Sequence, residues 1–257
     1  KLGEIYVNDA FGCAHRNHLS ITGGVILNYA ERVYGYLIHK EMNALNLITQ
    51  NPYKQKTMAI VGGAKMDDKL ALVKNLSKKV DTIYICGGNI NSILKNSMDE
   101  YMQEVQSNHA RVVLMEDGLA ATSLDTSVND SSHPRVKSID QLGESEYFYD
   151  MGPRSTITLH KLINEHSIVF WNGTIGVVEQ EKYRRGSEMC VEMLNHSMRL
   201  HPAQRVIIGG GDTGGFVNKY ENNFTHISTG GGASMEYITF NSLPGISIFQ
   251  KNVENAG

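Results

Sequence analysis

The chain has 257 residues, and its 24 Lys and Arg residues nearly balance its 27 Asp and Glu residues, for a formal net charge of -3 at pH 7. Near-neutral charge argues against a general nucleic-acid binder or a binder of acidic membranes, because both carry a strong basic excess. No stretch approaches the about 20 uninterrupted apolar residues that span a membrane. The length and the hydrophobic content of 41% predict a globular protein with one large domain or two small ones.

The three cysteines, Cys13, Cys86 and Cys190, are scattered, and no CxxC pair or His–Cys cluster accompanies them. The sequence therefore indicates neither a disulfide framework nor a structural zinc site, and it predicts a reducing, cytoplasmic compartment. The chain begins with Lys1 rather than Met and shows no signal-peptide pattern, so we expect the start to be a cut, with further residues upstream.

Two segments precede the glycine-rich part of the chain. Residues 4–8 form a short run that predicts a strand leading into a loop at residues 9–12, and this strand has no obvious partner nearby in the sequence. Between Ala30 and Leu45, apolar residues recur at helical spacing. This spacing predicts one long amphipathic helix over about residues 29–51.

From about residue 56 onward, short apolar runs alternate with amphipathic stretches. The runs are rich in β-branched residues and most of them end in glycines; they are residues 57–61, 82–86, 111–114, 168–171, 205–208 and 225–228. Continuous apolar runs are typical of strands that are buried on both faces of a parallel sheet. The pattern therefore predicts an α/β fold with a doubly wound, Rossmann-like parallel sheet. Ligands of such sheets bind beyond the carboxyl ends of the strands, where this chain places its glycines.

The first glycine motif, residues 62–69, leads from a predicted strand into a helix. Lys65 and Lys69 are four residues apart, so both can lie on one helix face and bind the same anion. Backbone N–H groups and the helix dipole add positive potential at such a turn, which suits a polyphosphate. The alternative is a tight turn with two solvated lysines. The spacing is not that of a Walker A loop.

Two further glycine-rich turns follow predicted strands. In residues 209–213, three glycines allow a ligand to approach the backbone closely, Asp212 is a candidate Mg²⁺ ligand, and Thr213 stands where a helix N-terminus would bind phosphate. The alternative for Asp212 or Thr213 is a helix N-cap. Residues 228–234 form a second nest of glycines and hydroxyls without a fixed charge, for which a turn with positive φ is the alternative.

Two other segments carry candidate ligand contacts. Asn172 is a candidate for a phosphate or sugar contact and Glu179 for the ribose hydroxyls, although Asn-Gly is also a common turn pair. His15 and Arg16 lie on an N-terminal loop, where Arg16 suits bidentate binding of an anion and simple solvation is the alternative. The GxSxG motif of hydrolases and the HExxH motif of zinc proteases are absent. Together, the five phosphate-compatible segments favour a nucleotide-binding phosphotransferase.

These segments, in this order, resemble the phosphoglycerate kinase family. Residues 6–16 resemble the signature loop of the family nearly residue for residue, and residues 35–41 resemble its interdomain helix. The segments that begin at residues 62, 171, 209 and 228 each match a motif of the family, and residues 243–246 resemble its C-terminal return. The resemblance covers essentially the whole chain.

The resemblance implies a two-domain, hinge-bending glycolytic enzyme that moves a phosphoryl group between MgATP or MgADP and 3-phosphoglycerate or 1,3-bisphosphoglycerate. Residues 1–28 would be a remnant of the N-terminal, phosphoglycerate-binding domain, 29–51 the interdomain helix, 52–239 the nucleotide-binding domain and 240–257 a C-terminal return segment. We expect a monomer that binds small molecules and neither nucleic acid nor membranes. An assembly partner is expected only if the truncation is native.

The resemblance also implies a role for each candidate residue. Four would act on the transferring phosphoryl group or on the acceptor: Lys65, Gly231 and Gly232 at the phosphoryl group, and Arg16 at phosphoglycerate. Seven would bind the nucleotide: Gly63, Lys69, Asn172, Glu179, Gly211, Asp212 and Thr213. Asp212 would also ligate Mg²⁺. Fixed cations, a metal ion and backbone dipoles stabilise the charge of a phosphoryl group in flight, and this set supplies them.

The sequence departs from the family at several points. Most of the N-terminal domain, with most of its basic patch, has no counterpart in this chain. Thr174 stands where the family usually has Pro, Val178 where it usually has Phe, and residues 89–91 replace a glycine and an aromatic-containing segment. We therefore expect a nucleotide half that binds MgADP or MgATP but turns over slowly by itself. The alternative is a non-catalytic truncated paralogue that serves as a nucleotide-binding or structural subunit.

Overall fold

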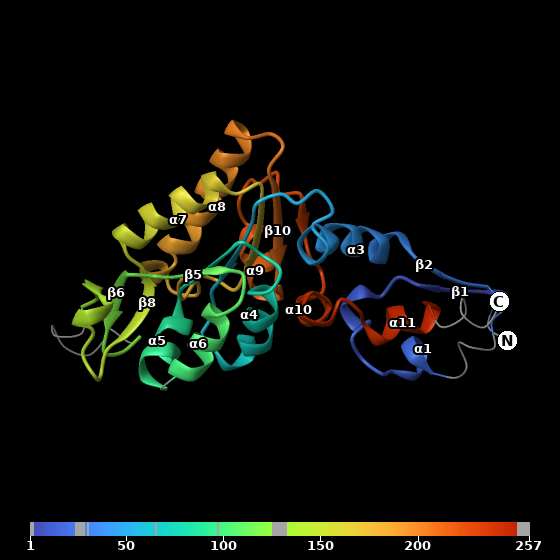
Figure 1. Ribbon diagram of the computed structural model, residues 1–257, viewed down its shortest axis with the longest axis horizontal. Coiled ribbons are helices and arrows are strands. Elements are labelled where there is room, and N and C mark those ends of the chain that lie inside the picture. Colours follow the sequence, from blue (N-terminus) through green and yellow to red (C-terminus); the bar gives the residue numbers. More distant parts are fainter. Residues whose placement is uncertain are drawn as a thin grey trace.

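The computed structural model describes residues 3–23, 29, 31–64, 66–96, 98–124 and 133–250. The molecule is elongated and has two parts of unequal size (Figure 1). The large part is built on a six-stranded sheet, and the small part brings the N-terminal strand close to the last helix, α11 (Pro244–Gln250). Helix α3 (Tyr36–Thr49) lies between the two parts.

All six strands of the central sheet are parallel, as the sequence predicts. Their order across the sheet is β11-β10-β9-β3-β4-β5. Their bounds are β3 (Thr57–Val61), β4 (Thr82–Ile85), β5 (Arg111–Leu114), β9 (Ile168–Asn172), β10 (Arg205–Gly209) and β11 (His226–Ile227). Every side chain of β3, β4 and β9 is buried, as expected for strands covered on both faces. The predicted doubly wound parallel sheet is confirmed.

Helices pack on both sides of this sheet. Figure 1 shows α7 and α8 on one side and α4, α5 and α6 on the other. Their bounds are α4 (Leu70–Leu76), α5 (Gly88–Lys95), α6 (Asp99–Gln106), α7 (Pro153–Glu165), α8 (Arg185–Leu200), α9 (Gly211–Val217) and α10 (Gly231–Phe240). Helix α4, for example, buries an apolar face made of Leu72, Val73 and Leu76. Within the described ranges, no helix is both long and apolar enough to cross a membrane.

The direction in which the chain crosses the sheet reverses between β3 and β9. From β3 the chain proceeds outward to β4 and β5, whereas β9, β10 and β11 follow one another on the other side of β3. Because crossover connections are right-handed, this reversal puts the connecting helices on opposite faces and leaves a crevice at the carboxyl ends of β3 and β9. The turns after these strands contain Gly62 and Gly173, so two of the predicted motifs meet at the crevice.

A three-stranded antiparallel sheet follows β5 in the chain. Its strands are β6 (Asp117–Ala121), β7 (Arg135–Ser138) and β8 (Tyr147–Met151), in the order β7-β6-β8. The sequence pattern does not predict this sheet, because its strands are short and include Asp, Gly and Ala, which have low β-propensity. Residues 125–134 are rich in Ser, Asn and Asp, a composition that predicts an exposed loop, and most of them lie outside the described residues. Helix α5 packs on β8, which becomes a wall of the site.

In the small part, β1 (Ile5–Asn8) pairs in parallel with β2 (Glu31–Tyr34). The predicted strand at residues 4–8 is confirmed, but the predicted helix over residues 29–51 is wrong at its start. Pairing with β1 holds residues 31–34 in an extended conformation, and α3 begins only at Tyr36. Gly35 leaves room for the Asp9 side chain, whose Oδ1 accepts the Ile38 N–H at 3.0 Å in the first turn of the helix.

The last helix packs on these N-terminal elements. The Phe249 and Tyr34 rings have centroids 4.5 Å apart, and the Tyr34 hydroxyl donates to Ile246 O at 2.7 Å. The Gly245 N–H donates to Ala14 O at 2.8 Å. Segments from both ends of the chain therefore build the small part together (Figure 1). The predicted domain boundaries after residues 28, 51 and 239 stay predictions.

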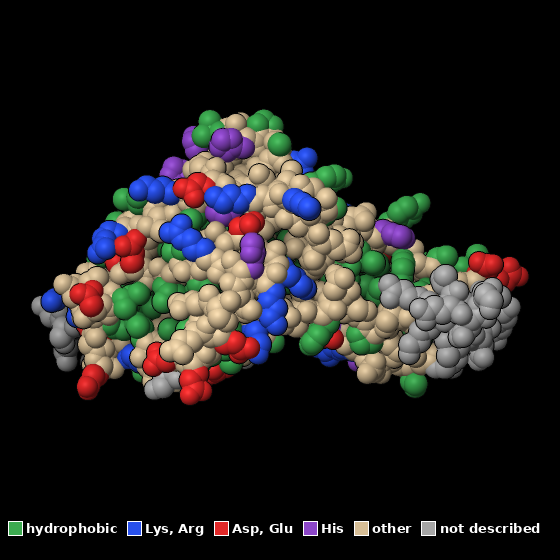
Figure 2. Space-filling model, in the orientation of Figure 1, with side chains coloured by type: hydrophobic (Ala, Val, Ile, Leu, Met, Phe, Trp, Pro, Cys, Tyr) green, Lys and Arg blue, Asp and Glu red, His purple; other side chains and the backbone are tan. Residues whose placement is uncertain are grey.

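Charged side chains of both signs occur across the large part on the face shown in Figure 2. Opposite charges pair at the start of α8, where Glu188 accepts from Arg184 Nε at 3.0 Å and from Arg185 at 3.4 Å. Interspersed charges of this kind fit the small net charge of the chain.

Candidate functional site

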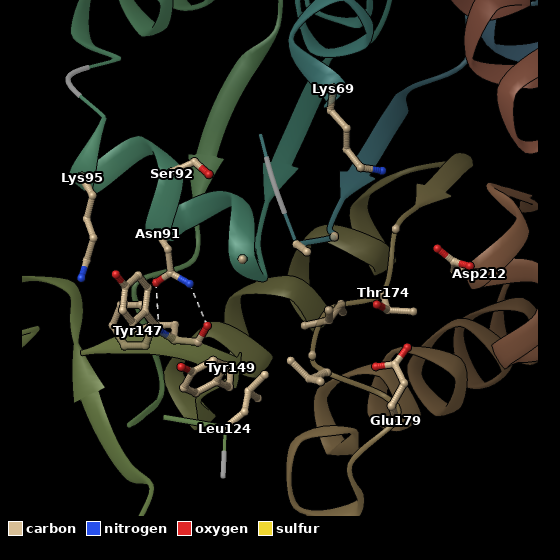
Figure 3. A pocket seen from close by; sticks show the side chains of 18 of the residues that line it. Lys69, Asn91, Ser92, Lys95, Leu124, Tyr147, Tyr149, Thr174, Glu179 and Asp212 are labelled. Atoms are coloured by element: carbon tan, nitrogen blue, oxygen red, sulfur yellow. Dashed lines mark hydrogen bonds between the residues drawn. The ribbon is translucent and has the colours of Figure 1, made fainter. Parts of the chain in front are cut away.

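Two cavities adjoin each other at the carboxyl ends of the central strands. The larger has a volume of about 870 Å³ and the smaller of about 200 Å³. Lys69, Gly173 and Asp212 line both of them. Figure 3 shows the larger cavity, with the side chains of Lys69 and Asp212 at the same end of it. A single elongated ligand therefore has room to extend from one cavity into the other.

Backbone hydrogen bonds join the turns that follow β3 and β9. The Gly62 N–H donates to Asn172 O at 2.9 Å, and the Gly63 N–H donates to Thr174 O at 2.7 Å. Gly63 has a φ of +113°, a conformation that favours glycine. The Lys69 ammonium donates to Asn172 Oδ1. The two motifs thus bring a lysine and a buried amide to one point of the crevice.

The Asn172 side chain carries the clearest sign of a ligand in the smaller cavity. It is 1% exposed, and its Nδ2 has no hydrogen-bond acceptor among the described residues. This nitrogen lies 3.2 Å from the place where a Cβ atom of Gly210 would be, beside the glycine turn after β10. An unpaired buried N–H group costs about 1–3 kcal/mol, so an acceptor oxygen supplied by a ligand would offset that cost.

Two helices begin at the smaller cavity. A Cβ atom on Gly231 would lie 2.7 Å from Gly211 N, which shows how closely the start of α10 approaches the start of α9. Gly210, Gly211, Gly231 and Gly232 all line the cavity, so the backbone itself forms its surface there. The N–H groups of the two first turns and the positive ends of the helix dipoles favour an anion such as phosphate.

Asp212 and Thr213 lie in the first turn of α9. The exposed Asp212 carboxylate lines both cavities, whereas Thr213 is buried and its Oγ1 accepts the Gly173 N–H at 2.7 Å. Within the described part of the chain, no group of three or more His, Cys, Asp or Glu side chains is placed to hold a metal ion. Asp212 nevertheless suits Mg²⁺, which takes one or two carboxylates and completes its shell with substrate phosphates and water.

Aromatic and polar side chains line the far end of the larger cavity. Tyr147 and Tyr149 project from β8, and Lys95 Nζ lies 3.7 Å from the centroid of the Tyr147 ring (Figure 3). Asn91 Nδ2 donates to Phe148 O at 2.9 Å, and its Oδ1 accepts the Phe148 N–H at 2.8 Å. A cleft of this size with apolar rings and a few polar groups suits a nucleoside. The sequence pattern does not single out these residues, because it does not predict β8.

Nine of the eleven predicted site residues line one cavity or the other: Gly63, Lys69, Asn172, Glu179, Gly211, Asp212, Thr213, Gly231 and Gly232. Lys65 lies outside the described residues. Arg16 is exposed and lines neither cavity, and its Nε lies 3.5 Å from His15 Nε2. His15 Nε2 in turn lies 3.2 Å from the place where a Cβ of Gly232 would be, so this pair borders the smaller cavity.

A family model described as phosphoglycerate kinase matches residues 1–240. The chain belongs to the phosphoglycerate kinase family. The phosphoglycerate kinase of Chlorobium luteolum is 37% identical to it over 264 residues, which cover 96% of this chain and 64% of that protein. That of Staphylococcus haemolyticus is 36% identical over 261 residues, which cover 95% of this chain and 63% of that protein. The chain thus spans about two thirds or slightly less of the length of these relatives.

Solved structures of phosphoglycerate kinases have the same fold. The phosphoglycerate kinase from Coxiella burnetii superposes with a TM-score of 0.84 at 29% identity, covering 98% of this chain and 66% of that one. The enzyme from Pyrococcus horikoshii gives a TM-score of 0.75 at 24% identity, over 97% of this chain and 65% of that one. The likeness extends over the small part as well as the central sheet, because nearly all of this chain is covered.

Two residues at which the sequence departs from the family, Asn89 and Thr174, lie beside the crevice. Asn89 is buried, and its Nδ2 donates to Val61 O at 3.2 Å and to Gly62 O at 2.9 Å. It lines neither cavity and instead braces the carboxyl end of β3. Thr174 lines the larger cavity, and its carbonyl oxygen accepts the Gly63 N–H. Both departures therefore leave the crevice between β3 and β9 in place. The roles of the individual site residues stay predictions.

Proposed function

We propose that this chain is the nucleotide-binding part of a phosphoglycerate kinase that moves a phosphoryl group between MgATP or MgADP and 3-phosphoglycerate or 1,3-bisphosphoglycerate, as in glycolysis. The observation that carries the proposal is the convergence of the unpaired Asn172 Nδ2 and the starts of α9 and α10 on one small cavity. An unpaired amide nitrogen beside two helix N-termini suits a phosphate.

The nucleotide would lie across both cavities. Its base and ribose would occupy the larger one, with the ribose near Glu179 and the base toward Tyr147 and Tyr149. Its phosphates would extend past Lys69 into the smaller cavity. The positive Lys69 ammonium would lie beside the phosphate chain, where a fixed cation offsets its charge.

Phosphoryl transfer needs mainly alignment and charge stabilisation. Gly231 and Gly232 would present backbone N–H groups to the transferring phosphoryl group, and Lys65 would add a cation. Asp212 would hold Mg²⁺ together with the nucleotide phosphates, and the ion supplies neutralisation of their negative charge when bound. Dipoles and charges that are fixed before the reaction stabilise the transition state without having to reorganise.

The acceptor would approach from the small part, where His15 borders Gly232 and Arg16 lies next to His15. Arg16 would bind the phosphoglycerate. The chain spans 64% of the length of the Chlorobium luteolum relative. By its resemblance to the family, most of the acceptor-binding surface would belong to the N-terminal domain, which these residues largely do not cover. We therefore propose that the chain by itself binds MgADP or MgATP but turns over very slowly.

Calorimetric titration of MgADP into the chain tests the nucleotide site. Asp212→Ala should weaken binding about tenfold or more, because one charged contact to the Mg²⁺–phosphate group is lost. Asp99→Ala is the matched control, since Asp99 is also an exposed acidic residue in the first turn of a short helix but lines neither cavity. Equal affinity in the wild type and Asp212→Ala, or no binding in either, would refute the proposed site and favour a structural role for the chain.

A further inference from the structure

The segment between Thr174 and Glu179 forms one wall of the larger cavity, and hydrogen bonds to α8 and β8 fix its backbone. The Ile175 N–H donates to Ser187 Oγ at 2.9 Å, and the Gly176 N–H lies 3.3 Å from the same oxygen. The Val177 N–H donates to Tyr149 O on β8 at 3.0 Å. Ile175, Gly176 and Val177 all line the cavity, so the position of this segment sets the shape of its wall.

A buried carboxylate lies directly behind this segment. Asp150 on β8 is 3% exposed, and its Oδ2 accepts the Gly186 N–H at 2.9 Å while its Oδ1 accepts the Met151 N–H at 2.9 Å. A Cβ atom on either Gly176 or Gly186 would overlap Oδ1, so both glycines leave space for the carboxylate. Asp150 thus lies between the cavity wall and the first turn of α8, where it accepts the N–H of Gly186, the residue before Ser187.

We infer that Asp150 is a positioning residue for the nucleoside end of the site. It fixes Gly186 and Ser187 in the first turn of α8, and Ser187 in turn fixes the cavity wall at Ile175 and Gly176. Asp150 lines neither cavity, so it acts through these residues and not by contact with the ligand. The inference rests on the proposed nucleotide-binding function and adds a residue to it that no sequence motif indicates.

The ionisation of Asp150 gives this arrangement a dependence on pH. Burial, with a smaller contribution from the Glu188 carboxylate, raises the pKa of Asp150 to about 7 overall, although the N–H groups of Gly186, Met151 and Arg185 lower it. Two neighbouring groups that can ionise face it from α8 and from the end of β4: Glu188 and Cys86. An ionised carboxylate accepts hydrogen bonds more strongly than a neutral one, so the wall is held best above about pH 7.

Titration of MgADP and of magnesium pyrophosphate at pH 6 and pH 8 tests the inference. Asp150→Asn keeps the shape of the side chain but not its charge, and it should weaken MgADP binding about fivefold at pH 8, the effect of one weakened hydrogen bond. At pH 6, where the wild-type carboxyl is largely protonated, the difference should shrink to less than twofold. Pyrophosphate affinity should stay unchanged at both values, because pyrophosphate occupies only the phosphate end.

Asp117→Asn is the matched control. Asp117 is also 3% exposed, and its Oδ1 and Oδ2 accept the Ser155 N–H at 2.7 Å and the Arg154 N–H at 3.1 Å at the start of α7, away from both cavities. It should bind MgADP like the wild type. Equal MgADP affinity in the wild type and a folded Asp150→Asn would overturn the inference, as would equal weakening of MgADP and pyrophosphate. Failure of the wild type to bind either ligand would refute the proposed function as well.

Ser187→Ala keeps the inference testable if Asp150→Asn does not fold. It removes the oxygen that accepts the Ile175 and Gly176 N–H groups and leaves Asp150 in place. We expect it to weaken MgADP binding to a similar extent without changing pyrophosphate binding. Wild-type MgADP affinity in this variant would overturn the inference, because the wall would then be held in some other way.

Discussion

Glu41 on α3 and His226 on β11 form a hydrogen bond of 2.7 Å in the interior, where His226 Nε2 donates to Glu41 Oε2. The other carboxylate oxygen, Oε1, accepts the Thr229 N–H at 2.7 Å and the Thr229 hydroxyl at 2.8 Å. Thr229 directly precedes the glycine turn at Gly230, which leads into α10. One buried carboxylate therefore connects the helix between the two parts with the turn that forms the smaller cavity.

Replacing Glu41 with leucine should lower the free energy of unfolding by about 3 kcal/mol or more. The variant leaves the Thr229 N–H and the His226 ring buried without their acceptor, and the loss of one partner from a buried polar pair has this magnitude. Urea unfolding followed by the fluorescence of Trp171, the only tryptophan, measures the change. Glu165→Leu is the control: Glu165 pairs with Lys56 at 3.8 Å on the surface, so its loss should cost less than 1 kcal/mol. Similar losses in both variants would contradict the prediction.

Glu41 and Asp150 should affect stability with opposite dependence on pH. Burial alone would raise the pKa of Glu41, but hydrogen bonds from His226 and Thr229 lower it overall, so its contribution is present at neutral pH and is lost on acidification. Burial raises the pKa of Asp150 from 3.8 to about 7, so the free energy of unfolding falls as the pH rises between these values, because the unfolded chain loses the Asp150 proton and the folded protein keeps it.

The Asp150→Asn variant isolates the second effect. Between about pH 4 and pH 7, the unfolded wild type has lost the Asp150 proton while the folded protein keeps it, and the shift corresponds to about 4 kcal/mol at most. The free energy of unfolding of the wild type should therefore fall across this range, and that of the variant should not fall for this reason, because asparagine does not ionise. Urea unfolding at pH 5 and pH 7.5 gives the free energy of unfolding of both proteins, and the difference between wild type and variant should change between the two pH values. A difference that stays constant across this range would show that Asp150 does not keep its proton on folding.

The sequence was sufficient to predict the central sheet because most of its strands are continuous apolar runs that end in glycines. This pattern is visible in the residues of each strand alone. It was insufficient where pairing with distant segments decides the structure. Residues 31–34 continue a helical spacing but form a strand because they pair with β1. Strands β6 and β8 are likewise stabilised by pairing with each other. The end of the site that we propose for phosphate carries glycine motifs, which the sequence pattern singles out. Tyr147, Lys95 and Asp150 carry no local signal and come together only through the fold.

Lys69→Ala should weaken MgADP binding about tenfold. The ammonium donates to Asn172 Oδ1 and lines both cavities, so its removal takes away a cation beside the phosphates and frees the Asn172 amide to turn. Calorimetry measures the affinity, with Lys74→Ala as the control. Lys74 follows on the same segment but pairs with Glu104 at 2.6 Å away from the cavities, and its replacement should leave the affinity unchanged. An equal change in both variants would point to a general charge effect.

Gly173→Ala should destabilise the protein and abolish nucleotide binding, whereas Gly215→Ala should do neither. Gly173 has a φ of +87°, and a Cβ there would overlap Gly62 O and approach Lys69 Nζ at 2.9 Å, so the turn after β9 would have to move away from β3. We expect a loss of at least about 2 kcal/mol in the free energy of unfolding. Gly215 lies inside α9 with nothing within 4 Å of a Cβ, so alanine there should stabilise the helix by up to about 1 kcal/mol. Urea unfolding and MgADP titration of the two variants provide the comparison, and a Gly173→Ala protein with wild-type affinity would show that the crevice between β3 and β9 does not hold the nucleotide.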